Sequence, residues 1–177
     1  MLIRTWLICV AFVLVVTNGR TVERSTAGQP PAHAPDFTLP DLQGKVLSLQ
    51  EMRGHVVVLN FWAFWCDTWK EELPHLKELA KEQSDRDFRL VAISVDGTRL
   101  QEFVDRTNGD IGFPVLLDAG GEVSASYKVA HVPTVVILDG SGIIRYKKSG
   151  YPGNEAIRTV LRRLHSEKGG TVSQMVK

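Results

Sequence analysis

The sequence predicts one α/β domain with a mixed central sheet and helices on both of its faces. Two largely apolar runs of strand length, residues 56–62 and 88–95, are each followed by apolar residues at helical spacing. Two later runs, 134–138 and 143–146, flank the turn residues 139–142, a pattern typical of an antiparallel hairpin. Strands that alternate with helices and then end in a hairpin indicate parallel and antiparallel pairing within one sheet.

The first residues are typical of an export segment. Arg4 precedes an uninterrupted apolar run at 7–16, which is short for a helix that must cross a bilayer. We therefore predict a signal peptide or a retained membrane anchor over residues 1–19, and both alternatives place the domain outside the cytoplasm. Residues 20–35 contain several prolines among small and polar residues, and we expect them to form a tether.

The domain itself is predicted over residues 36–167. Each expected strand is a short apolar or alternating run, and each expected helix places apolar residues three or four positions apart. In chain order we expect a strand pair at 37–39 and 46–49, a strand at 56–62, a helix after Cys66, a strand at 88–95, a helix around 100–104, a strand at 113–117, a helix at 122–127, the hairpin, and a last helix that begins at Asn154. This helix is expected to end before the glycines at 169 and 170, with a flexible tail over 168–177.

Charge and composition exclude some classes of partner. The chain has 21 basic and 20 acidic residues and a net charge of +1, so there is no electrostatic reason to expect nucleic acid as a partner. His55 and His75 show no metal-ligand spacing with Cys66. We expect neither a metal nor a cofactor.

Cysteine usage singles out one candidate reactive group. Of the two cysteines, Cys9 lies in the export segment, so Cys66 has no partner whether that segment is cleaved or kept in the membrane. An unpaired cysteine in an oxidising compartment is a candidate reactive thiol. Cys66 lies where a central strand ends and a helix begins, and helix N-terminal amides favour the thiolate. Lys70 would add to this effect and Asp67 would oppose it; the alternative is an inert buried cysteine.

The motifs around these residues resemble exported thioredoxin-like proteins of the TlpA/ResA type, within the redoxin or AhpC/TSA superfamily. The resemblance extends over about residues 34–164 and is carried by segments 34–41, 57–63, 113–118 and 127–129, by Trp65-Cys66 followed by Glu72 and Pro74, and by Val132-Pro133-Thr134. It implies a thioredoxin fold with an N-terminal strand pair and a central insertion, and thiol–disulfide exchange as the ancestral activity. It also implies a cis Pro133 with Val132 beside the reactive sulfur, and a location in the periplasm or at the outer face of the bacterial inner membrane.

One position departs from the family pattern. The family motif is Trp-Cys-x-x-Cys, whereas this chain reads Trp65-Cys66-Asp67-Thr68-Trp69. Thiol–disulfide exchange passes through a mixed disulfide that a second thiol normally breaks. Without a cysteine at position 69 the chain is not expected to form the internal disulfide or to run the ordinary dithiol cycle. Trp69 either packs on the apolar face of the helix or covers the sulfur and widens an apolar binding surface.

Further residues are expected close to Cys66. Glu72 matches an acid near the active site of the family, although a solvated position on the helix surface is the alternative. His131 stands where the family usually has glycine, and it either assists the thiol or is a solvated loop residue. Asn60 stands where thioredoxins carry a buried acid, so no carboxylate at that position can relay protons. The predicted surroundings of Cys66 are Trp62, Trp65, Trp69, Lys70, Glu72, His131, Val132 and Pro133.

Two functions remain open at this point. In the first, Cys66 forms mixed disulfides or a sulfenic acid that an external thiol resolves; its partners are protein thiols or disulfides and a membrane or periplasmic thiol reductant. In the second, the chain is a redox-inactive binding module that holds extended polypeptide in the groove around Trp65, Trp69 and Pro133. A one-cysteine peroxidase is disfavoured because Ala63 occupies the position of the threonine in the peroxidatic motif.

Overall fold

The structure is a computed structural model that describes residues 32–83, 85–96, 100, 104 and 111–174, with side chains described up to residue 168. The export segment predicted at 1–19, most of the tether and nearly all of the helix expected around 100–104 lie outside these ranges. Among the residues that are described, no helix combines the length and the apolar character that a membrane span requires.

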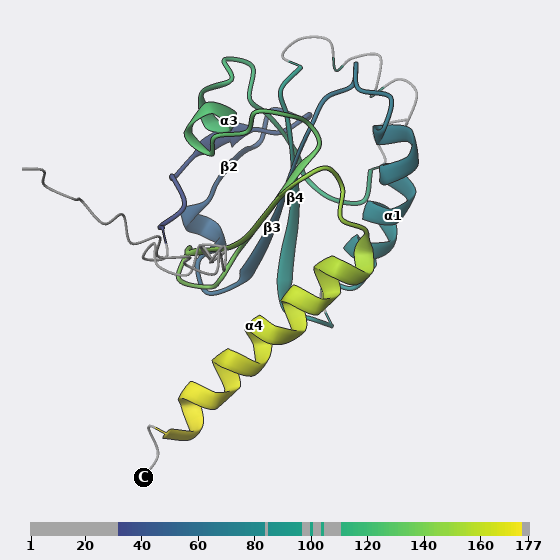
Figure 1. Ribbon diagram of the computed structural model, residues 1–177. Coiled ribbons are helices and arrows are strands. Elements are labelled where there is room, and N and C mark those ends of the chain that lie inside the picture. Colours follow the sequence, from purple (N-terminus) through teal and green to yellow (C-terminus); the bar gives the residue numbers. More distant parts are fainter. Residues whose placement is uncertain (1–31, 84, 97–99, 101–103, 105–110, 175–177) are drawn as a thin grey trace, which may run out of the picture.

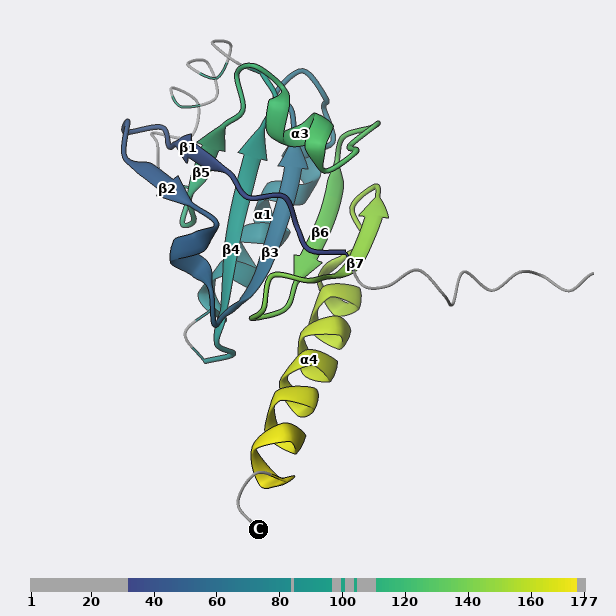
Figure 2. The same cartoon turned by 90° about the vertical axis from the view of Figure 1, so that its left-hand side faces the viewer.

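Five strands form the central sheet, in the order β5-β4-β3-β6-β7. β3 (Val56–Trp62) pairs in parallel with β4 (Phe88–Ser94), and β4 pairs in parallel with β5 (Val115–Leu117). On its other side β3 pairs antiparallel with β6 (Thr134–Leu138), which forms a hairpin with β7 (Ile144–Ser149). Figure 2 shows the five strands face on. The predicted mixed sheet and hairpin are confirmed.

Helices cover both faces of this sheet. α1 (Trp69–Lys81) and α4 (Asn154–Gln174) lie on one face, and the short α3 (Glu122–Ser126) lies on the other (Figure 1). The α3 face is also covered by a separate two-stranded antiparallel sheet, β1 (Thr38–Pro40) and β2 (Val46–Ser48), and by the 3-10 helix η1 (Gln50–Met52). The predicted N-terminal strand pair is therefore confirmed, and the thioredoxin fold accounts for the layers.

The alternation of side chains along β3 divides the core into two clusters. Successive residues of a strand point to opposite faces, so Val57, Leu59 and Phe61 pack toward α3 while Val56 and Val58 pack toward α1 and α4. Every residue of β3 is buried, as expected for a central strand covered on both faces. β3 is thus the rigid support for the turn that follows it.

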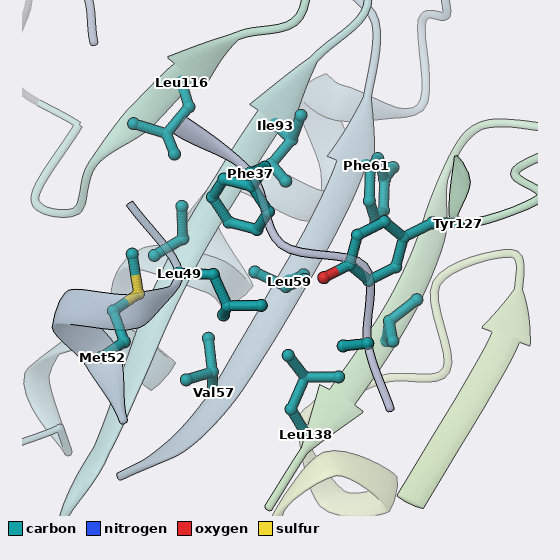
Figure 3. Close-up of a cluster of buried hydrophobic side chains, with 13 residues drawn as sticks. Phe37, Leu49, Met52, Val57, Leu59, Phe61, Ile93, Leu116, Tyr127 and Leu138 are labelled. Atoms are coloured by element: carbon teal, nitrogen blue, oxygen red, sulfur yellow. The ribbon is translucent and has the colours of Figure 1, made fainter. Parts of the chain in front are cut away.

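Phe61 and Tyr127 are neighbours in the α3-side cluster (Figure 3). Their ring centroids lie 5.3 Å apart with the planes tilted by 47°, which is a favourable aromatic arrangement. The Tyr127 hydroxyl donates a hydrogen bond of 2.8 Å to the carbonyl oxygen of Pro35. Burial raises the pKa of Tyr127 well above its ordinary value, so this donor keeps its proton. The cluster therefore joins the sheet, α3 and the N-terminal segment.

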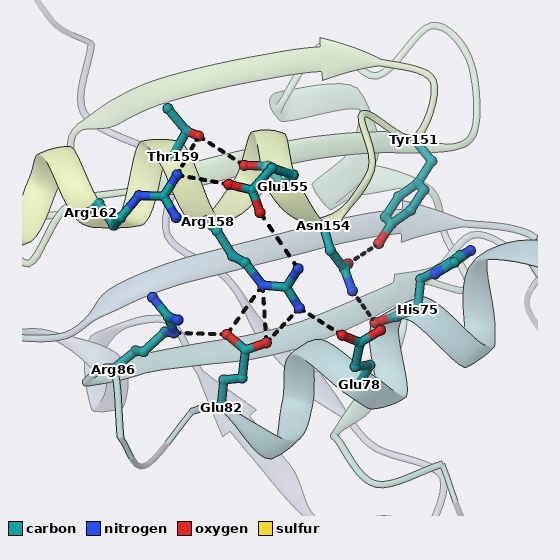
Figure 4. A network of polar contacts seen from close by, with 10 residues as sticks. All are labelled: His75, Glu78, Glu82, Arg86, Tyr151, Asn154, Glu155, Arg158, Thr159 and Arg162. Atoms are coloured by element: carbon teal, nitrogen blue, oxygen red, sulfur yellow. Dashed lines mark hydrogen bonds and ion pairs between the residues drawn. The ribbon is translucent and has the colours of Figure 1, made fainter.

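Arg158 of α4 holds that helix against α1 (Figure 4). Its Nη2 lies 2.8 Å from Oε1 of Glu78 on α1 and 2.6 Å from Oε1 of Glu82, the C-cap of that helix. One turn earlier in α4, Asn154 Nδ2 donates a 2.8 Å hydrogen bond to the carbonyl oxygen of His75. These contacts fix the direction of α1, the helix that follows Cys66.

Two boundaries differ from those predicted. Residues 32–35 belong to the fold rather than to a tether: Ala34 is buried, and its N–H donates a 2.8 Å hydrogen bond to Gly142 O. α4 continues to Gln174, so the predicted helix end before Gly169 is wrong. Residues 168–174, predicted as part of a flexible tail, are helical. Glycine costs about 1 kcal/mol in a helix but does not end one by itself.

Candidate functional site around Cys66

Cys66 lies in the turn that joins β3 to α1. Its N–H donates to Ala63 O at 3.2 Å, and its carbonyl oxygen accepts the N–H of Trp69 at 3.2 Å. The helix begins at Trp69 with Thr68 as its N-cap, so Cys66 precedes the N-cap by two residues. The side chain is half-buried and its thiol is free. Within the described part of the chain it is the only cysteine.

The sulfur has two polar contacts among the described residues. Cys66 Sγ lies 3.3 Å from Thr68 Oγ1 and 3.8 Å from the carbonyl oxygen of Val132. The Val132–Pro133 peptide bond is cis, as the resemblance implies. The loop before β6 and the turn after β3 therefore meet at this thiol.

The Lys70 side chain pairs with Asp67, the residue after Cys66, and not with the Cys66 sulfur. Its Nζ donates a 2.8 Å hydrogen bond to Asp67 Oδ1 and lies 6.0 Å from the centre of the Trp69 ring. The hydrogen bond and the positive charge of Lys70 hold the pKa of Asp67 below its usual range. The two opposing charges expected near the thiol thus form an exposed pair with each other, and such pairs contribute little to stability.

Trp69 packs at the base of the turn. Its Nε1–H donates a 2.9 Å hydrogen bond to Phe64 O, and its ring stacks on Phe64 with centroids 5.4 Å apart. The indole also lines a small pocket together with Trp62 and Asn60 of β3 and with Glu72 of α1. These contacts agree with the packing alternative for Trp69.

Glu72 lies inside the protein and not on the helix surface. It is 5% exposed and faces β3, so the solvated alternative is wrong. Burial raises the pKa of Glu72, while hydrogen bonding by the Thr68 and Asn60 side chains favours its charged form and opposes that shift. A buried carboxyl of this kind is suited to exchanging a proton.

The rim of the site is formed by exposed side chains. Trp65 is 62% exposed, and with His131 and Val132 it lines a surface pocket. A second pocket is lined by Thr68, Glu72 and Pro133, among other residues. In the described residues His131 makes no side-chain hydrogen bond to the sulfur, and its carbonyl oxygen accepts from Thr134 Oγ1 at 2.6 Å. The described residues contain no cluster of His, Cys, Asp or Glu that is arranged to hold a metal ion.

Two residues that form part of the site, Thr68 and Asp96, were not predicted from the sequence. Thr68 was not among the predicted neighbours of Cys66, although a hydroxyl two residues after a cysteine is within local reach of it. Asp96 lies two residues beyond the end of β4, where its Oδ2 accepts hydrogen bonds from Phe64 N–H at 2.5 Å and Ser94 Oγ at 2.9 Å. An acid at the carboxyl end of a parallel strand was the available signal for Asp96.

Comparison with known proteins places this site in a family. The model of the AhpC/TSA family matches residues 30–147. The chain belongs to the AhpC/TSA family. Among the curated members that it resembles, "Thiol-disulfide oxidoreductase ResA" of Bacillus thuringiensis subsp. konkukian (strain 97-27) is 32% identical over 133 residues, which are 74% of this chain and 76% of the relative. "Thioredoxin-like protein YneN" of Bacillus subtilis (strain 168) is 32% identical over 155 residues, 81% of this chain and 89% of the relative.

Solved structures agree with this assignment. The pneumococcal exposed lipoprotein thioredoxin Etrx1 of Streptococcus pneumoniae strain TIGR4 is 30% identical and has a TM-score of 0.65, with 73% of this chain and 99% of that chain covered. A putative thiol:disulfide interchange protein DsbE from Chlorobium tepidum is 25% identical and has a TM-score of 0.69, with 77% of this chain and 97% of that chain covered. This AhpC/TSA member therefore has a thioredoxin-like fold and is similar in sequence to thiol–disulfide oxidoreductases.

Proposed function

We propose that this protein is an extracytoplasmic thiol redox protein that works through Cys66 alone. The observation that carries the proposal is a free, half-buried thiol beside the Val132–Pro133 loop of a thiol–disulfide oxidoreductase fold, with tryptophan at position 69. The apolar run at 7–16 supports export to the periplasm or to the outer face of the inner membrane, with the run as signal or anchor.

The proposed reaction uses two exchange steps. The Cys66 thiolate attacks one sulfur of a substrate disulfide, so that an S–S bond forms to Cys66 as the substrate S–S bond breaks and its other sulfur leaves as a thiolate. An external thiolate then attacks the mixed disulfide, releases Cys66 as a thiolate and keeps the substrate half in a new disulfide. With a peroxide as oxidant, the same thiolate would become a sulfenic acid as the peroxide O–O bond breaks and the peroxide is reduced to water or an alcohol; one external thiol would then form a mixed disulfide with loss of water, and a second would release Cys66 as a thiolate.

A binding module is the second candidate. The exposed Trp65 indole and the surface pocket that it shares with His131 and Val132 favour this alternative, because aromatic rims are common at protein interfaces. In that case extended polypeptide would occupy the groove and Cys66 would form no covalent bond.

Cells that produce the full chain should contain covalent adducts of it. Because the part of the chain that the structure describes holds no second thiol to expel a bound partner, mixed disulfides are expected to persist after rapid acid quenching and alkylation, and to migrate above the monomer on a non-reducing gel. A Cys66→Ser variant is the matched control and should lack these bands, which should be found in the periplasmic or membrane fraction.

If the unchanged chain and the Cys66→Ser variant both migrate as clean monomers, the binding module is the better account. If equal adducts form with and without Cys66, a different residue is responsible and the proposal fails.

A further inference from the structure

Cys66 is the last residue of a tight turn that begins at Ala63. The N–H of Cys66 donates to the carbonyl oxygen of Ala63 at 3.2 Å, which is the bond that closes a β-turn. Phe64 and Trp65 are therefore the two central residues of this turn. Because the chain leaves β3 through them, the backbone angles at Phe64 set the position that Cys66 reaches.

Asp96 holds the N–H side of Phe64. Beyond the paired ends of β3 and β4, the N–H of Val95 still donates to the carbonyl oxygen of Trp62 at 3.1 Å. In a regular parallel ladder the next bond would join the N–H of Phe64 to the backbone that follows β4. Here that N–H donates to the side-chain Oδ2 of Asp96 at 2.5 Å. The carboxylate thus stands in for a backbone acceptor where the chain turns away from the sheet.

Asp96 is itself held in place by the end of β4. Ser94 is fully buried, and its hydroxyl donates to Asp96 Oδ2 at 2.9 Å and accepts the N–H of Asp96 at 3.2 Å. The second oxygen of the same carboxylate, Oδ1, is buried and has no hydrogen-bond partner among the residues that the structure describes. A buried acceptor without a partner costs free energy, so stability alone does not explain an acid at this position.

Trp69 holds the carbonyl side of Phe64. The indole Nε1–H donates to Phe64 O at 2.9 Å, and the two rings are stacked with an angle of 28° between their planes. Trp69 is the first residue of α1. The N–H and the carbonyl of Phe64 belong to successive rigid peptide groups, so the two hydrogen bonds together fix both backbone angles of that residue. The turn is therefore held from β4 on one side and from α1 on the other.

We propose that Asp96 and Trp69 are positioning residues for the Cys66 thiol. They act through the backbone of Phe64 and keep the sulfur beside the carbonyl oxygen of Val132, at 3.8 Å. Attack on a disulfide requires three sulfur atoms nearly in line, and a sulfur that is already held loses less conformational freedom in reaching that alignment. Position 69, where the family motif has its second cysteine, would then assist the first exchange step although it cannot perform the second.

The proposal is tested by comparing two reactions of Cys66 at one pH. Purified full-length protein is treated with bis(hydroxyethyl) disulfide, which forms a mixed disulfide, or with iodoacetamide, which alkylates the thiol; both reagents are uncharged, and both rates are read on the peptide that contains Cys66. Each rate is proportional to the fraction of thiolate, so the ratio of exchange to alkylation does not depend on that fraction. This ratio reports how well the sulfur is placed for exchange.

Trp69→Phe keeps an aromatic ring at position 69 and removes only the N–H donor. We expect it to lower the ratio of exchange to alkylation roughly tenfold, since a misplacement of about 1 Å can cost even more in rate. Asp96→Ala removes the acceptor and should lower the ratio by a similar factor. Asp96→Asn is the matched control, because it keeps a side-chain oxygen and loses only the charge, and it should restore the ratio.

Hydrogen exchange measured by nuclear magnetic resonance separates positioning from a general loss of stability. In Asp96→Ala the amide of Phe64 should exchange at least roughly tenfold faster, while the amide of Leu59, in the middle of β3, keeps its rate. Equal acceleration at both amides would mean that Asp96 only stabilises the fold, and the proposal would be wrong.

The ratio of the two rates decides the remaining outcomes. An unchanged ratio in Trp69→Phe is enough to overturn the proposal, and this variant alters no charge, so it serves even if Asp96→Ala does not fold. A ratio in Asp96→Asn as low as in Asp96→Ala would show that the charge matters and the hydrogen bond does not. The inference rests on the proposed function for its use in the cell. A lowered ratio without cellular adducts would reject that function alone, whereas adducts with an unchanged ratio would reject only the positioning role.

Discussion

A Trp69→Cys variant is expected to form a disulfide between positions 66 and 69 and, when pre-reduced, to reduce a small disulfide substrate without an external thiol to resolve the mixed disulfide, whereas the unchanged chain is expected to need one. The N–H of Trp69 donates to the carbonyl of Cys66 at 3.2 Å, so the two residues lie on one tight turn. Two cysteines at such a spacing can meet the geometric requirements of a disulfide. The gain is measured as the loss of both free thiols under mild oxidant and as complete reduction of one equivalent of substrate by the pre-reduced protein after the reductant has been removed.

Trp69→Ala is the matched control for this gain. Both variants lose the half-buried indole that stacks on Phe64 at 5.4 Å, and both should be destabilised by about 2–4 kcal/mol. Only the cysteine variant should form the internal disulfide and complete the reduction without an external thiol. A folded Trp69→Cys protein that keeps two free thiols under oxidant would contradict the placement of these residues and the role assigned to position 69.

Phe61→Ala is expected to lower the free energy of unfolding by about 3–5 kcal/mol, the usual cost of removing a fully buried phenylalanine. Phe61 lies next to the end of β3 with no exposed surface, and its ring packs on Tyr127 at 5.3 Å. The loss is read from the midpoint of urea-induced unfolding. Because β3 supports the turn that carries Cys66, a more reactive and more exposed thiol should accompany this loss.

Val46→Ala is the control variant for Phe61→Ala, because it shortens an exposed side chain instead of a buried one. Val46 is 56% exposed on β2, and its shortening should change the free energy of unfolding by no more than about 0.5 kcal/mol. Similar losses in Phe61→Ala and Val46→Ala would mean that the α3-side cluster is not the stabilising core described above.

The parts of the fold that were predicted from the sequence are those fixed by local patterns. The continuous apolar run at 56–62 indicates a strand buried on both faces, and the turn residues at 139–142 indicate a hairpin. Boundaries that depend on distant contacts were predicted wrongly. Ala34 is ordered because its N–H bonds to Gly142, and no signal near Ala34 indicates that pairing. The glycines at 169 and 170 do not end α4.

The site shows the same division between local and distant information. The cis Pro133 and the approach of Val132 to the sulfur followed from the family resemblance. The burial of Glu72 did not, because it depends on which face of α1 turns toward β3, and that face is set by the packing of the helix on the sheet. The charge of Lys70 was expected to act on the thiol, but its long side chain reaches Asp67 instead.

The central claim is that Cys66 forms a mixed disulfide that this chain cannot resolve, and intact-mass spectrometry of the purified protein tests it most directly. After incubation with a low-molecular-weight disulfide and removal of the excess, the account predicts one adduct, located at Cys66, that persists until an external thiol is added and is then released completely. The Trp69→Cys variant should expel the same adduct without added thiol. A chain that forms no adduct under these conditions, or one that loses it spontaneously, would contradict the claim.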